Sequence, residues 1–417
     1  MPEPESVRPP EPPSLKGANW LERRETQAVF DALAVGDVET RVVGGAVRNA
    51  LLGLPVTEMD LATSAVPDQV MALARQAKLK VIPTGIDHGT VTVVADGAAF
   101  EVTTLRRDVE TFGRHAQVAF TTDWEEDAQR RDFTLNALYA DRDGTVFDPL
   151  GGYEDLAQGR VRFIGDAEAR IREDYLRILR FFRFSAYYGK GAFDAEGLRA
   201  SVRLMGGLEQ LSAERVGAEL RRILVAPRAV EAIEAMFDFG LLTAVLGGVP
   251  RLDDFARLVA IEDAVGLQTN PARRLAVLAV FVEEDAPRLA ARLRLSNAEQ
   301  SVLELGAENS VDTGLPSETR AQELLYRLGA GIFPSFVLIA WARAAATAGD
   351  PQWRGALTLP ERWQAPSFPL RGTDIAELGR SGPEIGEALR RLERDWIARG
   401  FGEDREQLLA RARALAG

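Results

Sequence analysis

Residues 41–61 read RVVGGAVRNALLGLPVTEMDL and hold the strongest local signal in the chain. Residues 41–43 predict a short strand, which ends where Gly44 and Gly45 form a turn. From Val47 to Leu54 the apolar residues recur at helical spacing, so the turn leads directly into a helix. The stretch therefore predicts a strand–turn–helix unit, which is typical of a domain that combines a sheet with helices.

The remaining strand signals also lie in the N-terminal part of the chain. Residues 91–94 and 100–104 are rich in β-branched side chains, and the Asp96-Gly97 turn between them predicts two adjacent strands. From about residue 155 the sequence changes to helical segments rich in Leu, Ala, Arg and Glu. We therefore expect an α+β fold: an N-terminal head with a mixed β-sheet and helices, followed by an all-helical neck, body and tail.

The length of 417 residues, 46% of them hydrophobic, is enough for two to four domains with substantial cores. The expected divisions are a disordered proline-rich leader, a head, a helical neck, and a helical body with a tail, at residues 1–18, 19–155, 156–240 and 241–417. The leader lacks the apolar segment of a signal peptide, and no apolar run approaches the ~18 residues of a membrane span. We therefore expect a cytoplasmic protein that does not use a membrane.

Composition excludes several kinds of protein and site. The net charge of −12 excludes a uniformly basic nucleic-acid-binding protein, so RNA would have to be bound by a local basic patch. The absence of cysteine excludes disulfides, thiolate zinc sites and cysteine nucleophiles. Because the chain has only two histidines, His88 and His115, multi-histidine metal sites are excluded as well.

The first candidate site combines the glycine turn with a pair of acidic residues. Gly44 and Gly45 allow backbone amides to approach a phosphate, and Arg48, about one turn into the helix, can reach the same anion. If Glu58 and Asp60 lie on a strand, their carboxylates point to one face, as a pair of Mg²⁺ ions requires. On these residues alone, an ordinary turn and a solvated acidic pair remain the alternative.

Two further blocks place arginines beside carboxylates. Residues 130–138, RRDFTLNAL, could anchor a triphosphate or begin a salt-bridged helix. Residues 173–183, EDYLRILRFFR, predict one helix with an apolar stripe. Outside that stripe, Arg177, Arg180 and Arg183 recur every three residues and form a ladder of guanidinium groups suited to phosphates, with a solvated helix face as the alternative.

Taken together, the three blocks resemble the family of class II tRNA nucleotidyltransferases (CCA-adding enzymes) and bacterial poly(A) polymerases. The family begins with a Gly-Gly-x-x-Arg turn and an Asp-x-Asp pair, which are matched here by Gly44, Gly45 and Arg48 and by Glu58 and Asp60. Its second block, Arg-Arg-Asp-Phe-Thr-x-Asn-Ala, is matched by residues 130–137. Its Glu-Asp-x-x-Arg motif is matched by Glu173, Asp174 and Arg177. Residues 103–115 look like the family's flexible loop, and residues 211–216 resemble its next helical motif. The resemblance is strongest over residues 44–216.

The resemblance implies template-independent addition of C, C and A to the 3′ end of tRNA from CTP and ATP by two-metal nucleotidyl transfer. It implies a nucleotidyltransferase head in which Glu58 and Asp60 are catalytic and hold Mg²⁺. The residues that it assigns to nucleotide binding are Gly44, Gly45, Arg48, Arg131, Asp174, Arg177, Arg180 and Arg183. Within this set, Asp174 and Arg177 would read the base, and a third carboxylate would come from Glu101 on a neighbouring strand.

One position departs from the family pattern, because Glu58 stands where the family has the first aspartate. Glutamate remains an oxygen ligand, but Mg²⁺ geometry tolerates little displacement. We expect a working site because the arginine and base-reading positions are all present. The alternatives are a poly(A) polymerase or a partial enzyme that adds only CC or only A, and, from another class, an inactive RNA-binding protein. The oligomeric state is not indicated by any pattern.

Overall fold

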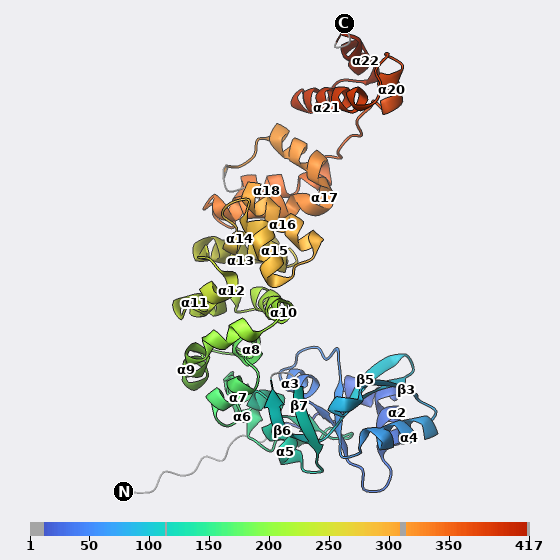
Figure 1. Cartoon of the computed structure of the whole chain (residues 1–417), viewed down its shortest axis with the longest axis vertical. Coiled ribbons are helices and arrows are strands. Elements are labelled where there is room, and N and C mark those ends of the chain that lie inside the picture. The colour runs from blue at the N-terminus through green and yellow to red at the C-terminus, as the bar shows by residue number, and fades with distance from the viewer. Residues whose placement is uncertain (1–11, 113–114, 309–313, 415–417) are drawn as a thin grey trace. The chain divides into compact units, whose positions relative to one another are not determined.

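The computed structural model describes residues 12–112, 115–308 and 314–414 and divides into two compact units, residues 1–247 and 248–417 (Figure 1). The first unit is built on a seven-stranded sheet in the order β3-β4-β5-β2-β1-β8-β9. Its strands are β1 (Thr40–Val43), β2 (Asp60–Thr63), β3 (Lys80–Gly85), β4 (Thr90–Ala95), β5 (Ala98–Thr104), β8 (Tyr139–Ala140) and β9 (Val146–Phe147). Only β2 and β5 pair in parallel, so the predicted mixed sheet is confirmed.

The hairpin of β4 and β5 forms where the sequence predicts it. Asp96 and Gly97 both have positive φ angles, 47° and 85°, the backbone of a tight turn whose twist matches that of the strands. Val91, Val93 and Val102 are fully buried, because alternate side chains of both strands face the same core. The helices α2 (Arg24–Leu33) and α4 (Pro67–Gln76) contact these strands.

A second, two-stranded antiparallel sheet consists of β6 (Arg106–Phe112) and β7 (His115–Phe120). These strands occupy the segment that resembles the family's flexible loop, and its residues 113–114 lie outside the described residues. The backbone amide of Thr121, after β7, donates to the carbonyl of Leu105, before β6, at 2.9 Å. The hairpin is therefore closed at the end where it joins the main sheet.

Helices dominate the rest of the first unit. They are α1 (Asn19–Glu22), α3 (Gly45–Leu51), α5 (Trp124–Gln129), α6 (Gly152–Gln158), α7 (Ala167–Glu173), α8 (Leu176–Tyr188), α9 (Ala195–Arg203), α10 (Ala213–Leu224), α11 (Ala229–Asp238) and α12 (Leu241–Leu246), with short 3₁₀ turns at Ile86–His88, Thr134–Asn136 and Met205–Gln210. Residues 1–11 of the expected leader lie outside the described residues, but Leu15 is buried and its amide donates to Gly144 O at 2.7 Å.

The second unit is entirely helical within residues 248–308 and 314–414, in agreement with the predicted helical body and tail. Its helices are α13 (Leu252–Val265), α14 (Pro271–Ala279), α15 (Asp285–Leu293), α16 (Asn297–Glu308), α17 (Glu318–Arg343), α18 (Pro351–Leu357), α19 (Leu359–Arg362), α20 (Gly372–Ala376), α21 (Pro383–Ala398) and α22 (Arg405–Ala414). The last three pack around Trp396, which is 1% exposed, and Tyr326 of α17 packs against the same cluster.

Among the described helices, only α17 is long and apolar enough to cross a membrane. From the sequence, no apolar run of this length was expected. The helix is interrupted at Gly329, where φ is 73° and ψ is 162°, and it contains Pro334. Beyond this break, Phe333 and residues 337–343 are all buried, so the high hydropathy of the segment reflects packing in the core of the second unit.

Candidate active site

A cavity of about 690 Å³ in the first unit is lined by every residue that the sequence assigned to the site. Its walls come from β1, β2, β5, the start of α3, the 130–136 block, α8 and Arg215 of α10. Eight arginines and five carboxylates line it, so the cavity is locally basic in a chain whose net charge is −12. A small pocket with excess guanidinium groups is suited to a polyphosphate.

One edge of the cavity carries three carboxylates. Asp60 begins β2 and lies opposite Glu101 in the parallel register with β5, so their side chains are neighbours on one face. Glu58 lines the cavity from the segment before β2, so the predicted strand contains Asp60 but not Glu58. Partial burial and the negative charges of Glu101 and Glu58 raise the pKa of Asp60, against the opposing charge of Arg131.

The glycine turn holds Arg48 against the opposite wall. Gly44 has φ 69° and ψ −115°, a conformation that L-residues with a side chain avoid, and it brings the chain into α3. The guanidinium of Arg48 donates to Asn136 Oδ1 at 2.5 Å and to the Tyr188 hydroxyl at 2.7 Å, and it lies 4.1 Å over the Tyr188 ring. Arg48 is therefore fixed by both the head and helix α8.

Arg130 and Arg131 of the Arg-Arg-Asp block are both bound by Asp127, a residue for which no role was expected from the sequence. Asp127 of α5 is 1% exposed, and its carboxylate accepts from both Arg130 and Arg131. The spacing of Asp127 to these arginines, three and four residues, is the signal that could have revealed it. Asp132 instead pairs with Arg180, whose Nη2 lies 2.5 Å from Asp132 Oδ2.

The base-reading segment differs from the continuous helix that the sequence predicts. Helix α7 ends at Glu173, Asp174 is extended with φ −156° and ψ 106°, and α8 begins at Leu176. The free amide of Leu176 donates to Asp174 Oδ1 at 3.1 Å, so the aspartate caps the new helix. An aspartate that competes for the backbone in this way favours a helix break over a helix interior.

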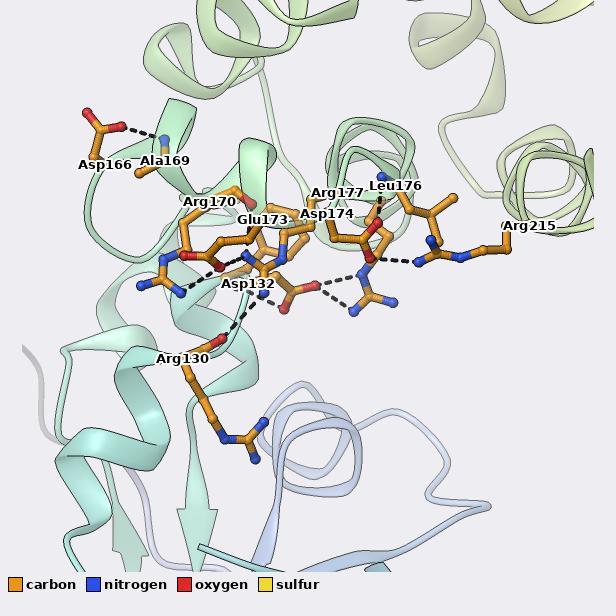
Figure 2. A network of polar contacts seen from close by, with 12 residues as sticks. Arg130, Asp132, Asp166, Ala169, Arg170, Glu173, Asp174, Leu176, Arg177 and Arg215 are labelled. Carbon is orange, nitrogen blue, oxygen red and sulfur yellow. Dashed lines mark hydrogen bonds and ion pairs between the residues drawn. The ribbon is translucent and has the colours of Figure 1, made fainter. Parts of the chain in front are cut away.

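Figure 2 shows how Asp174 and Arg177 are held side by side at this break. Arg215 of α10 donates to Asp174 Oδ2 at 2.6 Å. Arg177 is ion-paired with Glu173 and donates to the carbonyl of Arg170 at 2.8 Å. Both side chains that were predicted to read the base line the cavity, each held by a different partner. The sequence indicated Arg215 only as part of a helical motif.

The other two arginines of the predicted ladder also line the cavity. The Cζ atoms of Arg180 and Arg183 lie 5.2 Å and 4.7 Å from the ring centre of Phe184. Cation–π attraction of each guanidinium to this ring offsets part of the repulsion between the two positive charges. Arg183 Nη1 lies 3.2 Å from Glu219 Oε1, and Glu219 is 4% exposed. Phe184 and Glu219 had no signal in the sequence beyond ordinary helical patterning.

Comparison with known proteins agrees with this geometry. The chain matches the family models described as "Poly A polymerase head domain" at residues 40–162 and "Probable RNA and SrmB- binding site of polymerase A" at residues 193–255. It is 37% identical over 394 residues to the mitochondrial CCA tRNA nucleotidyltransferase 1 of Mus musculus, covering 92% of this chain and 88% of the relative. The chain belongs to the CCA-adding tRNA nucleotidyltransferases.

Other members of the CCA-adding family match over nearly the whole chain. The CCA-adding enzyme of Geobacillus stearothermophilus is 34% identical over 400 residues, covering 93% of this chain and 96% of that enzyme. The crystal structure of the Bacillus stearothermophilus CCA-adding enzyme in complex with CTP superposes with a TM-score of 0.70 at 28% identity, covering 94% of this chain and 96% of that one. The family resemblance seen in the sequence is therefore confirmed, and it extends beyond residues 44–216.

Proposed function

We propose that this protein adds C, C and A to the 3′ end of tRNA, using CTP and ATP and no nucleic-acid template. The observation that carries the proposal is the single cavity in which the Asp60–Glu101 edge faces the arginines of three separate sequence blocks. Membership in the family supports it, because relatives that match nearly the whole chain are named CCA-adding enzymes.

The carboxylate edge fits a divalent cation. Asp60 and Glu101 present oxygen donors on adjacent strands. Partial burial, together with the negative charges of Glu101 and Glu58, raises the pKa of Asp60 against the opposing charge of Arg131. Among the described residues no group of three or more acidic, histidine or cysteine side chains is placed to hold a metal ion. Two carboxylates and open positions suit Mg²⁺, which is shared with substrate phosphates. Bound there, Mg²⁺ would lower the pKa of the primer 3′-hydroxyl and neutralise the triphosphate.

The protein's own groups then orient the reactants. Arg48, Arg131, Arg180 and Arg183, which line the same cavity as Asp60, would bind the triphosphate and hold the α-phosphate in line with the attacking hydroxyl. Four guanidinium groups fixed by neighbouring side chains lose little freedom when the anion binds. This arrangement favours positioning and electrostatic stabilisation over any covalent chemistry with the protein.

Base choice would follow from Asp174 and Arg177. A carboxylate accepts from the amino group of C or A, and a guanidinium donates to the adjacent ring acceptor. U and G present a carbonyl where the amino group should be, so the carboxylate would face another acceptor at a cost of ~2–3 kcal/mol. Arg215 holds Oδ2 of Asp174 and the Leu176 amide holds Oδ1. Each carboxylate oxygen keeps a second lone pair with which to accept from the base.

The test uses three tRNA primers, which end at the discriminator base, at C and at CC, each with one NTP at a time. Addition of C to the first two primers and of A to the third supports the proposal. Repeated A addition to any primer would identify a poly(A) polymerase, and incorporation limited to C or to A would identify a partial enzyme. No incorporation with any primer would leave an RNA-binding protein as the function.

Localisation in the cytoplasm, where tRNA is available, remains part of the proposal. The relatives that match nearly the whole chain include mitochondrial enzymes.

A further inference from the structure

Asp127 lies behind the cavity wall and does not line it. Its Oδ1 accepts from Arg130 Nε at 2.8 Å and lies 2.7 Å from Arg130 Nη2. Its Oδ2 accepts from Arg131 Nη2 at 3.0 Å and from Arg131 Nε at 3.3 Å. One carboxylate therefore holds two successive guanidinium groups, each through two nitrogens, which is the arrangement that best fixes an arginine in a plane.

Two further contacts saturate the same carboxylate. The Tyr139 hydroxyl of β8 donates to Oδ2 at 2.9 Å, and the backbone amide of Arg106, at the start of β6, donates to Oδ1 at 3.4 Å. Asp127 thus joins the Arg-Arg-Asp block to the main sheet and to the base of the β6–β7 hairpin. Burial opposes ionisation here, but the charges of Arg131 and Arg130 outweigh it and lower the pKa of Asp127 to about 2.

The contacts leave the third nitrogen of Arg131, Nη1, near the glycine turn that lines the cavity. With Nε and Nη2 engaged by Asp127, Nη1 lies 3.8 Å from the place that a Cβ on Gly44 would take. The charge of Arg131 also acts on Asp60, whose pKa it lowers against the neighbouring carboxylates. Arg131 is therefore held between a buried carboxylate behind it and the cavity in front of it.

We propose that Asp127 is a positioning residue for nucleotide binding, which fixes Arg130 and Arg131 so that their remaining donors face the triphosphate. This inference rests on the proposed function, since it assumes that the cavity takes a nucleoside triphosphate. Asp127 does not line the cavity and so would not contact the base, and the two arginines would bind phosphates. Asp127 would therefore affect the binding of all nucleotides by the same factor. Its role differs in this respect from that of Asp174.

The packing around α5 explains why the carboxylate can act as a rigid support. Trp124, one turn before Asp127, packs edge-on against Tyr139 with ring centres 5.2 Å apart. The Asp123 carboxylate caps the helix by accepting from the amide of Glu125 at 2.8 Å. Because the helix and the tyrosine are both fixed, displacement of the Asp127 carboxylate would be transmitted to the two arginines.

The experiment compares Asp127→Asn with Glu125→Gln in the full-length protein. Glu125 lies on the same helix but is exposed, and its carboxylate accepts a hydrogen bond from the side chain of Gln129. Its substitution removes the same charge from a side chain that is not hydrogen-bonded to Arg130 or Arg131. We expect Asp127→Asn to weaken CTP and ATP binding, measured by calorimetry, by about 10- to 100-fold and by the same factor for both. Glu125→Gln should leave both affinities within about twofold of wild type.

A double-mutant cycle separates positioning from a general structural role. If Asp127 acts through Arg131, Asp127→Asn should cost much less affinity in an Arg131→Lys background than alone, whereas a structural role would give additive losses. Asp127→Glu, which keeps the charge and moves the carboxylate, provides the same test if the asparagine variant does not fold. Unchanged CTP and ATP affinity in a folded Asp127 variant, or additive losses in the cycle, would overturn the inference.

The two proposals fail in different ways. If the wild-type protein binds neither CTP nor ATP, both the proposed function and the role of Asp127 are wrong. If the wild type binds both nucleotides and extends tRNA, and the Asp127 variants bind as tightly, only the positioning role is wrong.

Discussion

Asp132 and Arg180 form an ion pair with 2.5 Å between Oδ2 and Nη2, and this pair connects two sequence blocks that lie 48 residues apart. Asp132 also accepts from the side chain of Asn136 at 2.9 Å, and Asn136 in turn accepts from Arg48. The first candidate site and the Arg-Arg-Asp block are thereby joined to helix α8 through one chain of polar contacts. A change in any of these residues should therefore affect both the fold and nucleotide binding.

Replacement of Arg180 with alanine is expected to weaken all four nucleotides about equally, because a phosphate contact carries no information about the base. The loss of its partner also leaves the Asp132 carboxylate, 9% exposed, without its cation. We expect a stability loss of about 1–3 kcal/mol, measured by urea unfolding. An Arg180→Ala variant that discriminates bases differently from wild type, measured as kcat/KM for each NTP, would contradict the assignment.

Replacement of Asp174 with alanine should relax discrimination against U and G more than it lowers triphosphate binding. The acceptor for the amino group is lost, and with it the penalty of placing a carbonyl against a carboxylate. The measurement is kcat/KM for CTP, ATP, UTP and GTP on one tRNA primer, with Arg180→Ala as the control for a phosphate contact. Equal losses for all four nucleotides would make Asp174 a structural partner of Arg215.

The sequence predicted the strand before the Gly44 turn, the two strands around the Asp96-Gly97 turn and the candidate residues that line the cavity. It gave no signal for β3, β8 and β9 or for the contacts that hold the cavity together. The strands around the Asp96-Gly97 turn and the glycine turn at Gly44 follow from local backbone preferences, so pattern and structure agree. The break at Asp174 was missed because the apolar stripe starts at Tyr175, after the break, and carries no information about how Glu173 and Asp174 join it. The hydrogen bond from the Leu176 amide to the Asp174 side chain is a local interaction that periodicity does not report.

Two residues of the site could not be identified from the sequence for the same physical reason. Arg215 and Tyr188 are far along the chain from the groups that they contact, and only tertiary folding brings Arg215 to Asp174 and Tyr188 to Arg48. Asp127 is different, since its contacts to Arg130 and Arg131 are local and its spacing was readable. The strand that was conditionally expected to contain Glu58 begins two residues later, at Asp60, and pairs it with Glu101.

The substitution Asp60→Asn should abolish nucleotide addition while it leaves tRNA binding nearly unchanged, because metal ligation serves the chemical step and RNA is gripped elsewhere. The same change removes a carboxylate that Glu101 and Glu58 repel, so the metal-free protein should become slightly more stable, by an amount that solvent screening of the exposed Asp60 keeps small. Single-turnover incorporation of CTP and urea unfolding without divalent cations measure the two effects. Retention of more than a few percent of the wild-type rate would disprove the metal-site assignment.

The position of Glu58 outside the strand makes the substitution Glu58→Asp informative. Glu58 is exposed and precedes β2, and aspartate would restore the residue that the family pattern has at this position. We expect the variant to keep or exceed wild-type activity and to need no more Mg²⁺ for half-maximal rate. A complete loss of activity, with unchanged CTP binding, would mean that the backbone before β2 has adapted to the longer side chain.

The stabilising effect of Asp127 should depend on pH in a defined window. Its pKa is lowered to about 2 in the folded protein, whereas an unfolded aspartate titrates near ~3.9. A lowered acid pKa contributes stability that is fully present above the unfolded value and is lost as the pH falls toward the folded value. The difference in unfolding free energy between wild type and Asp127→Asn should therefore be about 2 kcal/mol at pH 7 and decrease between about pH 5 and pH 2. Urea unfolding at several pH values in this range, with Glu125→Gln as the matched control, measures the difference. A gap between wild type and Asp127→Asn that stays constant down to pH 3 would show that the Asp127 carboxylate is not stabilised by its two arginines.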